Sequence, residues 1–199
     1  QADVTTLKGD GSLWWGGGID LGLHHILGIA ESDDWVLFVN NDTELRSEFV
    51  HQLLHAARRL APAAVGSVIR DLAAPNRLLS IGPQIYAWGL SVRDVMDSNG
   101  ADVSGDEEVT AVDALSGRGV LYSVAALRAV GGMRPRWLPH YLADYELSIR
   151  IRSAGYKLYV SHTAAVYSHD EYGSQERATN LVDRLFSVRS PTYLPALVC

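Results

Sequence analysis

Three absences narrow the class of protein. Cys199, the last residue, is the only cysteine of 199 residues, which excludes an internal disulfide framework and a cysteine-rich zinc site. No uninterrupted apolar stretch is long enough to cross a bilayer, and residues 1–8 lack a signal-peptide pattern. Basic charge is not in excess, since the formal net charge is -6. We therefore expect a cytoplasmic protein that does not bind nucleic acid.

The composition that remains is that of an ordinary folded domain. Hydrophobic residues make up 47% and charged residues 20% of the chain, far from the signature of disorder. A chain of this length forms one domain with a single sizeable core more readily than two. We therefore expect one domain over residues 1–199.

Strand-like and helix-like patterns alternate along the first part of the chain. Strands are predicted at 4–7, 35–39, 64–69, 78–81, 85–88, 157–160 and 164–167, with further regular structure within 109–122. Helices are predicted at 19–30, from a cap at Ser47 to the residues before Pro62, and at 124–130, 144–154 and 176–188. This order favours an α/β/α sandwich around a mixed, mostly parallel sheet. Residues 71–113 form a loop-rich insertion, and residues 174–199 a C-terminal helix and tail.

A polar cluster directly follows the apolar run at 35–39. Asn40 and Asp42 alternate along the chain and can point the same way, offering an amide oxygen and a carboxylate to one divalent cation. Ligands of open α/β sheets bind at such strand ends. A simple Asn-Asn-Asp-Thr turn that caps the next segment explains the cluster equally well.

A second acidic residue, Asp144, lies near the start of the predicted helix at 144–154. A helix N-terminus stabilises an anion, so this carboxylate can stay ionised and accept a proton. Taken alone, a plain N-cap is the commoner explanation of an aspartate there. Glu146 supports the helix start and can pair with Arg150 at i+4.

Four segments, in this order, resemble family 2 glycosyltransferases of the GT-A fold, particularly a rhamnosyltransferase-like branch. They are the glycine-rich double-tryptophan segment 9–18, the strand and aspartate motif 36–43, the pocket loop 115–121 and the segment 139–146. Together they extend the resemblance over residues 4–173. The implied fold is the GT-A nucleotide-diphospho-sugar transferase fold, with the family's N-terminal nucleotide-binding segment expected to be missing.

The resemblance implies a metal-assisted transfer that inverts the anomeric centre, with Asp144 as the catalytic base. It places Mg²⁺ or Mn²⁺ at Asp42 and His169. Two departures stand out: the usual aspartate-x-aspartate signature reads Asn40-Asn41-Asp42, and the usual Glu-Asp pair reads Ala143-Asp144. The residues implied to contact donor or acceptor are Trp14, Trp15, Gly17, Asn40, Asn41, Gly117, Arg118, Gly119, His140 and Tyr141.

The implied partners are a nucleotide-diphosphate sugar and a glycan or lipid-linked acceptor, in cell-envelope polysaccharide synthesis. Such an acceptor is compatible with peripheral contact with the inner face of the membrane. The oligomeric state stays open. Rhamnose on a thymidine carrier is an expectation of the branch.

Three alternatives compete with this interpretation. A Rossmann oxidoreductase is suggested by the glycines at 16–18, but a clean G-x-G-x-x-G is missing. A zinc hydrolase is suggested by His51 and His55, although Gln52 replaces the glutamate of H-E-x-x-H. The third is a truncated or degenerate GT-A domain that binds saccharide or nucleotide without catalysis.

Overall fold

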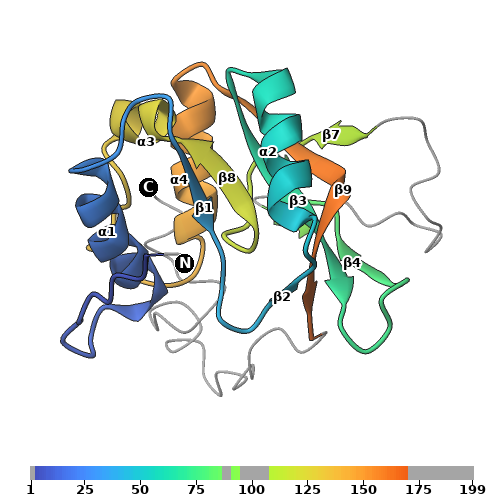
Figure 1. Ribbon diagram of the computed structural model, residues 1–199, viewed down its shortest axis with the longest axis horizontal. Helices are drawn as coiled ribbons and strands as arrows, with labels where there is room; N and C mark the ends of the chain where they lie inside the picture. Colours follow the sequence, from blue (N-terminus) through green and yellow to red (C-terminus); the bar gives the residue numbers. More distant parts are fainter. Residues whose placement is uncertain (1–2, 87–90, 95–107, 170–199) are drawn as a thin grey trace. The chain divides into compact units, whose positions relative to one another are not determined.

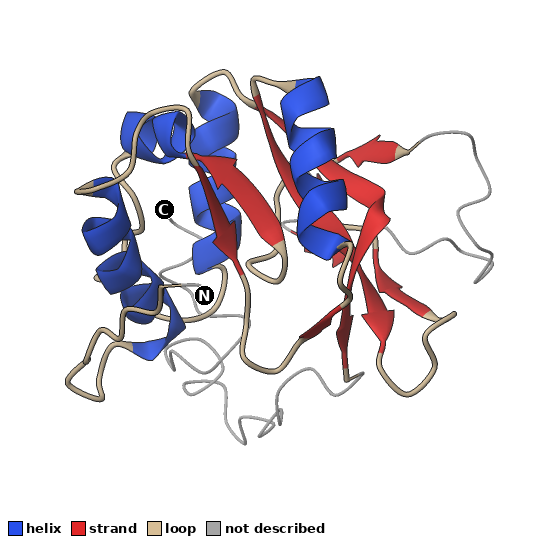
Figure 2. Ribbon diagram, viewed as in Figure 1, coloured by secondary structure: helices blue, strands red, loops and turns tan. Residues whose placement is uncertain are grey.

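The computed structural model describes residues 3–86, 91–94 and 108–169 (Figures 1 and 2). The helices are α1 (Trp14–Leu27), α2 (Phe49–Leu60), α3 (Val124–Val130) and α4 (Ala143–Ser153). The strands are β1 (Trp35–Phe38), β2 (Glu44–Leu45), β3 (Ala63–Asp71), β4 (Leu78–Ser80), β5 (Pro83–Tyr86), β6 (Ser91–Asp94), β7 (Val109–Ala111), β8 (Val120–Ser123) and β9 (Lys157–Ser168).

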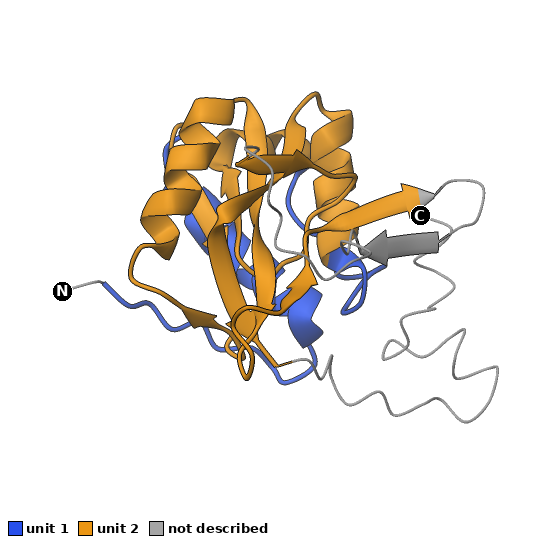
Figure 3. Cartoon of the chain, turned by 90° about the vertical axis from the view of Figure 1, so that its right-hand side faces the viewer, with its two compact units in different colours: residues 1–31, 131–143, 175–199 blue, residues 32–130, 144–174 orange. Residues whose placement is uncertain are grey.

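The described chain forms two compact units (Figure 3). The first unit comprises residues 3–31 and 131–143, and holds α1. The second comprises the described parts of 32–130 and 144–169, and holds all the strands.

The main sheet of the second unit is mixed, with strand order β1-β8-β3-β9-β2 and with β4 and β7 pairing β3 and β9. The α/β class is confirmed, but the expectation of a mostly parallel sheet is wrong for the described strands. Only β3 and β9 pair in parallel, and the other pairs are antiparallel. The reason is topological: β1, β3 and β9 run in one direction, but β8 is inserted antiparallel between the first two.

Helices cover both faces of this sheet (Figure 1). On one face, α2 packs Phe49 and Leu53 against Val65 and Val166, all of them buried. Alternate residues along a strand face opposite ways, so Tyr122 of β8 points to the other face while Leu121 joins the α2 core. Leu147 and Ile151 of α4 are fully buried. The apolar spacing along both helices thus buries residues of each helix, as expected for the predicted sandwich.

Most predicted elements agree with the structure. The apolar run at 35–39 forms β1, the run at 64–69 lies within β3, and α3 has the predicted bounds. The predicted strands at 157–160 and 164–167 are one strand, β9, with an irregularity opposite Ser67 and Val68 of β3. The insertion predicted at 71–113 contains β4 to β7. The end of the strand predicted at 85–88 and the predicted helix at 176–188 lie outside the described residues.

Two local predictions are wrong. Residues 4–7 form no strand, and Val4 is 87% exposed, since a short β-favouring run is not a strand unless a neighbouring strand pairs with it. Ser47 does not cap α2, because its hydroxyl donates to the Glu48 carboxylate and the position before Phe49 is Glu48 itself.

In the first unit, α1 begins at Trp14, earlier than the helix predicted at 19–30. Its glycines lie within the helix: the Gly16 N–H donates to the Pro139 carbonyl at 2.8 Å, and a Cβ at Gly16 would lie 2.7 Å from the Leu138 carbonyl oxygen. Close backbone approach therefore requires glycine there. Across the described residues, no helix combines the length and apolar character that a membrane crossing needs.

Candidate functional site

The segment that follows β1 carries the first candidate residues. Asn40 to Thr43 form a turn in which the Thr43 hydroxyl donates to the Asn40 carbonyl at 2.7 Å. Asn41 and Asp42 are exposed, and Asn40 is half-buried. The turn therefore presents the Asp42 carboxylate to solvent at the end of β1, as its position in the sequence predicts.

The short strand β2 brings His169 towards this segment. Glu44 of β2 pairs with Tyr167 of β9 in antiparallel register. Asp42 precedes Glu44 by two residues and His169 follows Tyr167 by two, so both leave this strand pair at the same end. His169 is exposed.

The loop between β7 and β8 connects the end of β1 to the middle of the sheet. The Gly119 N–H donates to the Phe38 carbonyl at 2.9 Å, and the Gly119 carbonyl accepts from the Ser67 N–H at 2.9 Å. Gly119 has a φ of 74°, and a Cβ there would overlap Ser67 and Val166. Only glycine fits both the left-handed backbone and this close packing.

The same loop also contacts Asp144, through Gly117, two residues before Gly119. The Gly117 N–H donates to Asp144 Oδ2 at 2.8 Å, and the Tyr145 N–H donates to Oδ1 at 3.0 Å. Asp144 is the second residue of α4 and is half-buried. Burial raises the pKa of its carboxyl above the usual 3.8, while these two N–H groups and the charge of Arg118 offset part of that shift.

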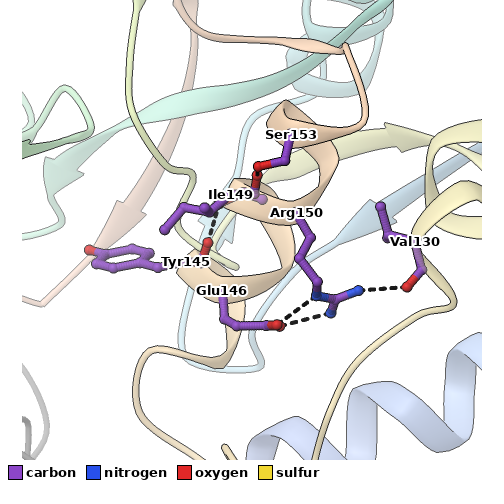
Figure 4. Close-up of polar contacts among 7 residues, drawn as sticks. Val130, Tyr145, Glu146, Ile149, Arg150 and Ser153 are labelled. Atoms are coloured by element: carbon purple, nitrogen blue, oxygen red, sulfur yellow. Dashed lines mark hydrogen bonds and ion pairs between the residues drawn. The ribbon is translucent and has the colours of Figure 1, made fainter. Parts of the chain in front are cut away.

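Arg150 anchors the helix that carries Asp144 (Figure 4). Its guanidinium donates to both carboxylate oxygens of Glu146, at 2.6 and 2.8 Å, which confirms the predicted i+4 pair. It also donates to the carbonyl of Val130, the last residue of α3, at 2.7 Å. Both charged side chains are less than 20% exposed. Through these hydrogen bonds, Arg150 links α4 to the C-terminal end of α3.

Two buried residues near Asp144, Ser148 and Tyr122, were not predicted from the sequence as part of the site. Ser148, fully buried, accepts from the Leu115 N–H at 2.9 Å and donates to the Tyr145 carbonyl at 2.9 Å. Tyr122 of β8 is also fully buried. Burial and the neighbouring charge of Asp144 raise the pKa of its hydroxyl. Ser148 follows Asp144 by four residues, and this helical spacing is the signal that could have identified it.

The aromatic candidates belong to the first unit. The rings of Trp14 and His140 lie 5.8 Å apart, and those of His140 and Tyr141 lie 4.6 Å apart. Burial lowers the pKa of His140, and its Nδ1 is buried without a hydrogen-bond partner among the described residues. Trp14 and Leu142 have positive φ values, 52° and 62°. Strained backbone of this kind concentrates at functional sites.

The predicted site residues thus fall into two groups, one in each unit. The second unit holds Asn40, Asn41, Asp42, Gly117, Arg118, Gly119, Asp144 and His169. The first unit holds Trp14, Trp15, Gly17, His140 and Tyr141. Within the second unit, residues 115–119 connect the end of β1 to Asp144.

The donor set for a metal is small. Asp42, Asn40 and His169 offer a carboxylate, an amide oxygen and an imidazole, a combination that suits Mn²⁺ or Mg²⁺ completed by further oxygen ligands. No three His, Cys, Asp or Glu side chains in the described part of the chain are grouped closely enough to hold a metal ion by themselves. A metal bound there would need ligands beyond these protein groups.

Comparison with known proteins gives two positive findings and one negative one. The chain is similar to the crystal structure of GalNAc-T7 with UDP, GalNAc and Mn2+, with a TM-score of 0.59 and 11% identity over 79% of this chain. It spans 30% of that structure's chain, and at this identity the likeness shows the GT-A fold alone. No curated protein matches the sequence. Residues 17–184 match the family described as "Glycosyltransferase like family 2". The chain therefore belongs to the family 2 glycosyltransferases.

Proposed function

We propose that the chain transfers a sugar from a nucleotide-diphosphate donor to an acceptor hydroxyl with inversion, and that Asp144 is the general base. The observation that carries this proposal is the state of Asp144. Its carboxylate is half-buried, held by two backbone N–H groups, and has a raised pKa. A carboxylate whose pKa moves towards the working pH is a stronger base, and a fixed one needs no reorganisation.

The proposed chemistry is a single displacement. The acceptor oxygen bonds to the anomeric carbon and loses its proton to Asp144. The bond from that carbon to the diphosphate oxygen breaks, and the nucleoside diphosphate leaves with the electron pair. Attack opposite the leaving group inverts the anomeric centre. Deprotonation by a placed carboxylate contributes roughly 10²- to 10⁴-fold to the rate of such a step.

Asn40, Asp42 and His169 are the residues that we propose to hold a divalent metal. Their support is the exposed carboxylate of Asp42 and the shared direction in which Asp42 and His169 leave the β2–β9 pair. When bound, Mg²⁺ or Mn²⁺ supplies positive charge that offsets the charge developing on the leaving diphosphate.

The loop at 115–119 is the proposed donor contact of the second unit. Gly117 and Gly119 are fixed by backbone hydrogen bonds, and Arg118 between them carries a positive charge suited to phosphate. In the first unit, the Trp14, His140 and Tyr141 rings offer apolar faces suited to sugars. For Trp15 and Gly17, which follow Trp14 in α1, a donor or acceptor contact rests on the family resemblance. Rhamnose as the sugar, a glycan or lipid-linked acceptor, and work at the inner face of the membrane rest on the family resemblance.

A second candidate function is binding of saccharide or nucleotide without transfer. One observation favours it: the usual aspartate-x-aspartate signature reads Asn40-Asn41-Asp42, so Asp42 is the one carboxylate of that motif. This candidate keeps the family's fold and the loop at 115–119 but makes Asp144 catalytically silent. The two functions predict different outcomes for the same titration.

The experiment is a calorimetric titration of the chain with UDP and with dTDP, each with and without Mn²⁺, followed by a transfer assay with the nucleotide that binds. The proposal expects metal-dependent binding that Asp42→Ala weakens and Asp144→Asn preserves. Asp33→Ala is the matched control, since Asp33 is another exposed loop aspartate. Binding without transfer under any acceptor condition favours the second candidate, and no nucleotide binding to the folded chain contradicts both the donor site and the metal assignment.

A further inference from the structure

Asp144 and Ser148, on one face of α4, both accept hydrogen bonds from the loop at 115–119. Four residues apart, they lie one above the other on the helix. Ser148 accepts from the Leu115 N–H at 2.9 Å, and Asp144 accepts from the Gly117 N–H at 2.8 Å. Two acceptors one turn apart thus receive two N–H groups two residues apart.

The Ser148 hydroxyl both accepts and donates in this arrangement. It donates its proton to the Tyr145 carbonyl, so its oxygen is free to accept only. The side chain is 0% exposed, where an unmet backbone N–H costs about 1–3 kcal/mol. Leu115 is equally buried, so water cannot easily replace the lost acceptor. The contact therefore sets where the loop begins.

The other end of the loop is fixed independently. Gly119 is bonded to Phe38 and Ser67 through its own N–H and carbonyl. With Leu115 tied to α4 and Gly119 tied to the sheet, the intervening residues have little freedom. Arg118 and Tyr122 are the charged and titratable groups that face Asp144 from this loop and from β8.

We propose that Ser148 is a positioning residue, which holds the loop at 115–119 so that the Gly117 N–H stays on the Asp144 carboxylate. It touches neither substrate nor reacting atoms and acts through Gly117. The inference rests on the proposed function for its effect on transfer, but its effect on Asp144 is a property of the unliganded protein.

The test is a ¹³C NMR titration of the Asp144 carboxyl, assigned by its loss in Asp144→Asn, in the parent and in Ser148→Ala. Without the Ser148 oxygen the Gly117 N–H is less well held, and loss of a hydrogen bond to the charged form raises a pKa. We expect the titration midpoint of Asp144 to rise by about one pH unit, roughly a tenfold change in the ionisation constant. The acidic limb of the pH profile of kcat/KM should move by the same amount.

Ser153→Ala is the matched control. Ser153 lies on the same helix, but its hydroxyl donates only to the Ile149 carbonyl one turn back and is exposed (Figure 4). It should leave the midpoint unchanged. If Ser148→Ala does not fold, Ser148→Cys replaces it, with a similar volume and a weaker acceptor, and a smaller shift of the same sign is expected.

An unmoved Asp144 midpoint in a folded Ser148 variant overturns the inference. A parent that transfers no sugar, together with a midpoint that still moves in Ser148→Ala, overturns the proposed function and leaves the positioning role standing. The two failures are therefore separate.

Discussion

Asp42 and Asp144, the two candidate site carboxylates of the second unit, are held in opposite ways. Asp144 is half-buried and accepts N–H groups from Gly117 and Tyr145. Asp42 is exposed on a turn, and no hydrogen bond or ion pair of its carboxylate occurs among the described residues. The fold therefore fixes the geometry of one carboxylate in advance and leaves the other to be ordered by what binds to it. This difference suits a base and a ligand, respectively.

The largest effect should come from Asp144→Asn, which keeps an acceptor for the Gly117 N–H but cannot take a proton. We expect transfer to fall by about a thousandfold, within the range of general-base catalysis, while nucleotide binding is retained. The measurement is kcat/KM beside calorimetric affinity. Equal rates in Asp144→Asn and the parent would remove Asp144 as the base.

The same substitution should change stability in a pH-dependent way. The raised pKa of Asp144 means that the folded protein binds this proton more tightly than the unfolded chain does. That contribution is complete below the ordinary value of 3.8 and is lost as the pH rises through the folded-state pKa. Asp144→Asn, always neutral, should therefore melt at a higher temperature than the parent at pH 7, with the gap narrowing in acid. A gap that does not depend on pH would contradict this account.

Gly119→Ala should be the most destabilising of these substitutions. The left-handed backbone costs an alanine roughly 1–2 kcal/mol, and overlap with Ser67 and Val166 adds about 1–3 kcal/mol. Urea unfolding should show a loss of about 2–5 kcal/mol. The control is Gly22→Ala, at a helical position with open space, which should be neutral or slightly stabilising. Equal stability of the two variants would mean that the loop adapts.

Asp42→Ala tests the exposed carboxylate of the two. Losing a metal ligand should lower the Mn²⁺-dependent part of nucleotide affinity by about tenfold to a hundredfold. Folding stability should not change, because this exposed side chain contributes little packing. Titrations with and without Mn²⁺ separate the two quantities. Mn²⁺ dependence that survives unchanged would remove Asp42 as a ligand.

Arg150→Met is expected to have the smallest effect, on the anchoring of the helix that carries Asp144. It removes a bidentate pair with Glu146 and a hydrogen bond to the Val130 carbonyl. We expect a loss of about 1–2 kcal/mol in the free energy of unfolding. Arg152→Met is the control, because its pair with Asp113 is about 40% exposed and should contribute less than about 1 kcal/mol. Equal losses would show that burial of the Glu146 pair has no consequence.

Features with a strong local period were predictable from the sequence. β1, α3 and α4 follow from apolar runs, helical spacing and glycine stops. The placement of Asp144 at the start of α4 followed in the same way. Features set by distant partners were not predictable. Residues 4–7 lack a pairing strand, Gly16 lies within α1 because of the Pro139 carbonyl, and β8 is inserted between β1 and β3.

The features of the candidate site also divide into those that the sequence predicts and those that depend on tertiary contacts. The sequence alone located the two candidate carboxylates, because Asp42 follows the apolar run that forms β1 and Asp144 begins a helix, and both positions are consequences of local periodicity. Only the tertiary structure decided that Gly117 donates to Asp144, that Gly119 joins the loop to β1 and that Ser148 holds Leu115. Those contacts join residues 27 or more positions apart. Their formation depends on how α4, the loop and the sheet pack, which no local pattern encodes.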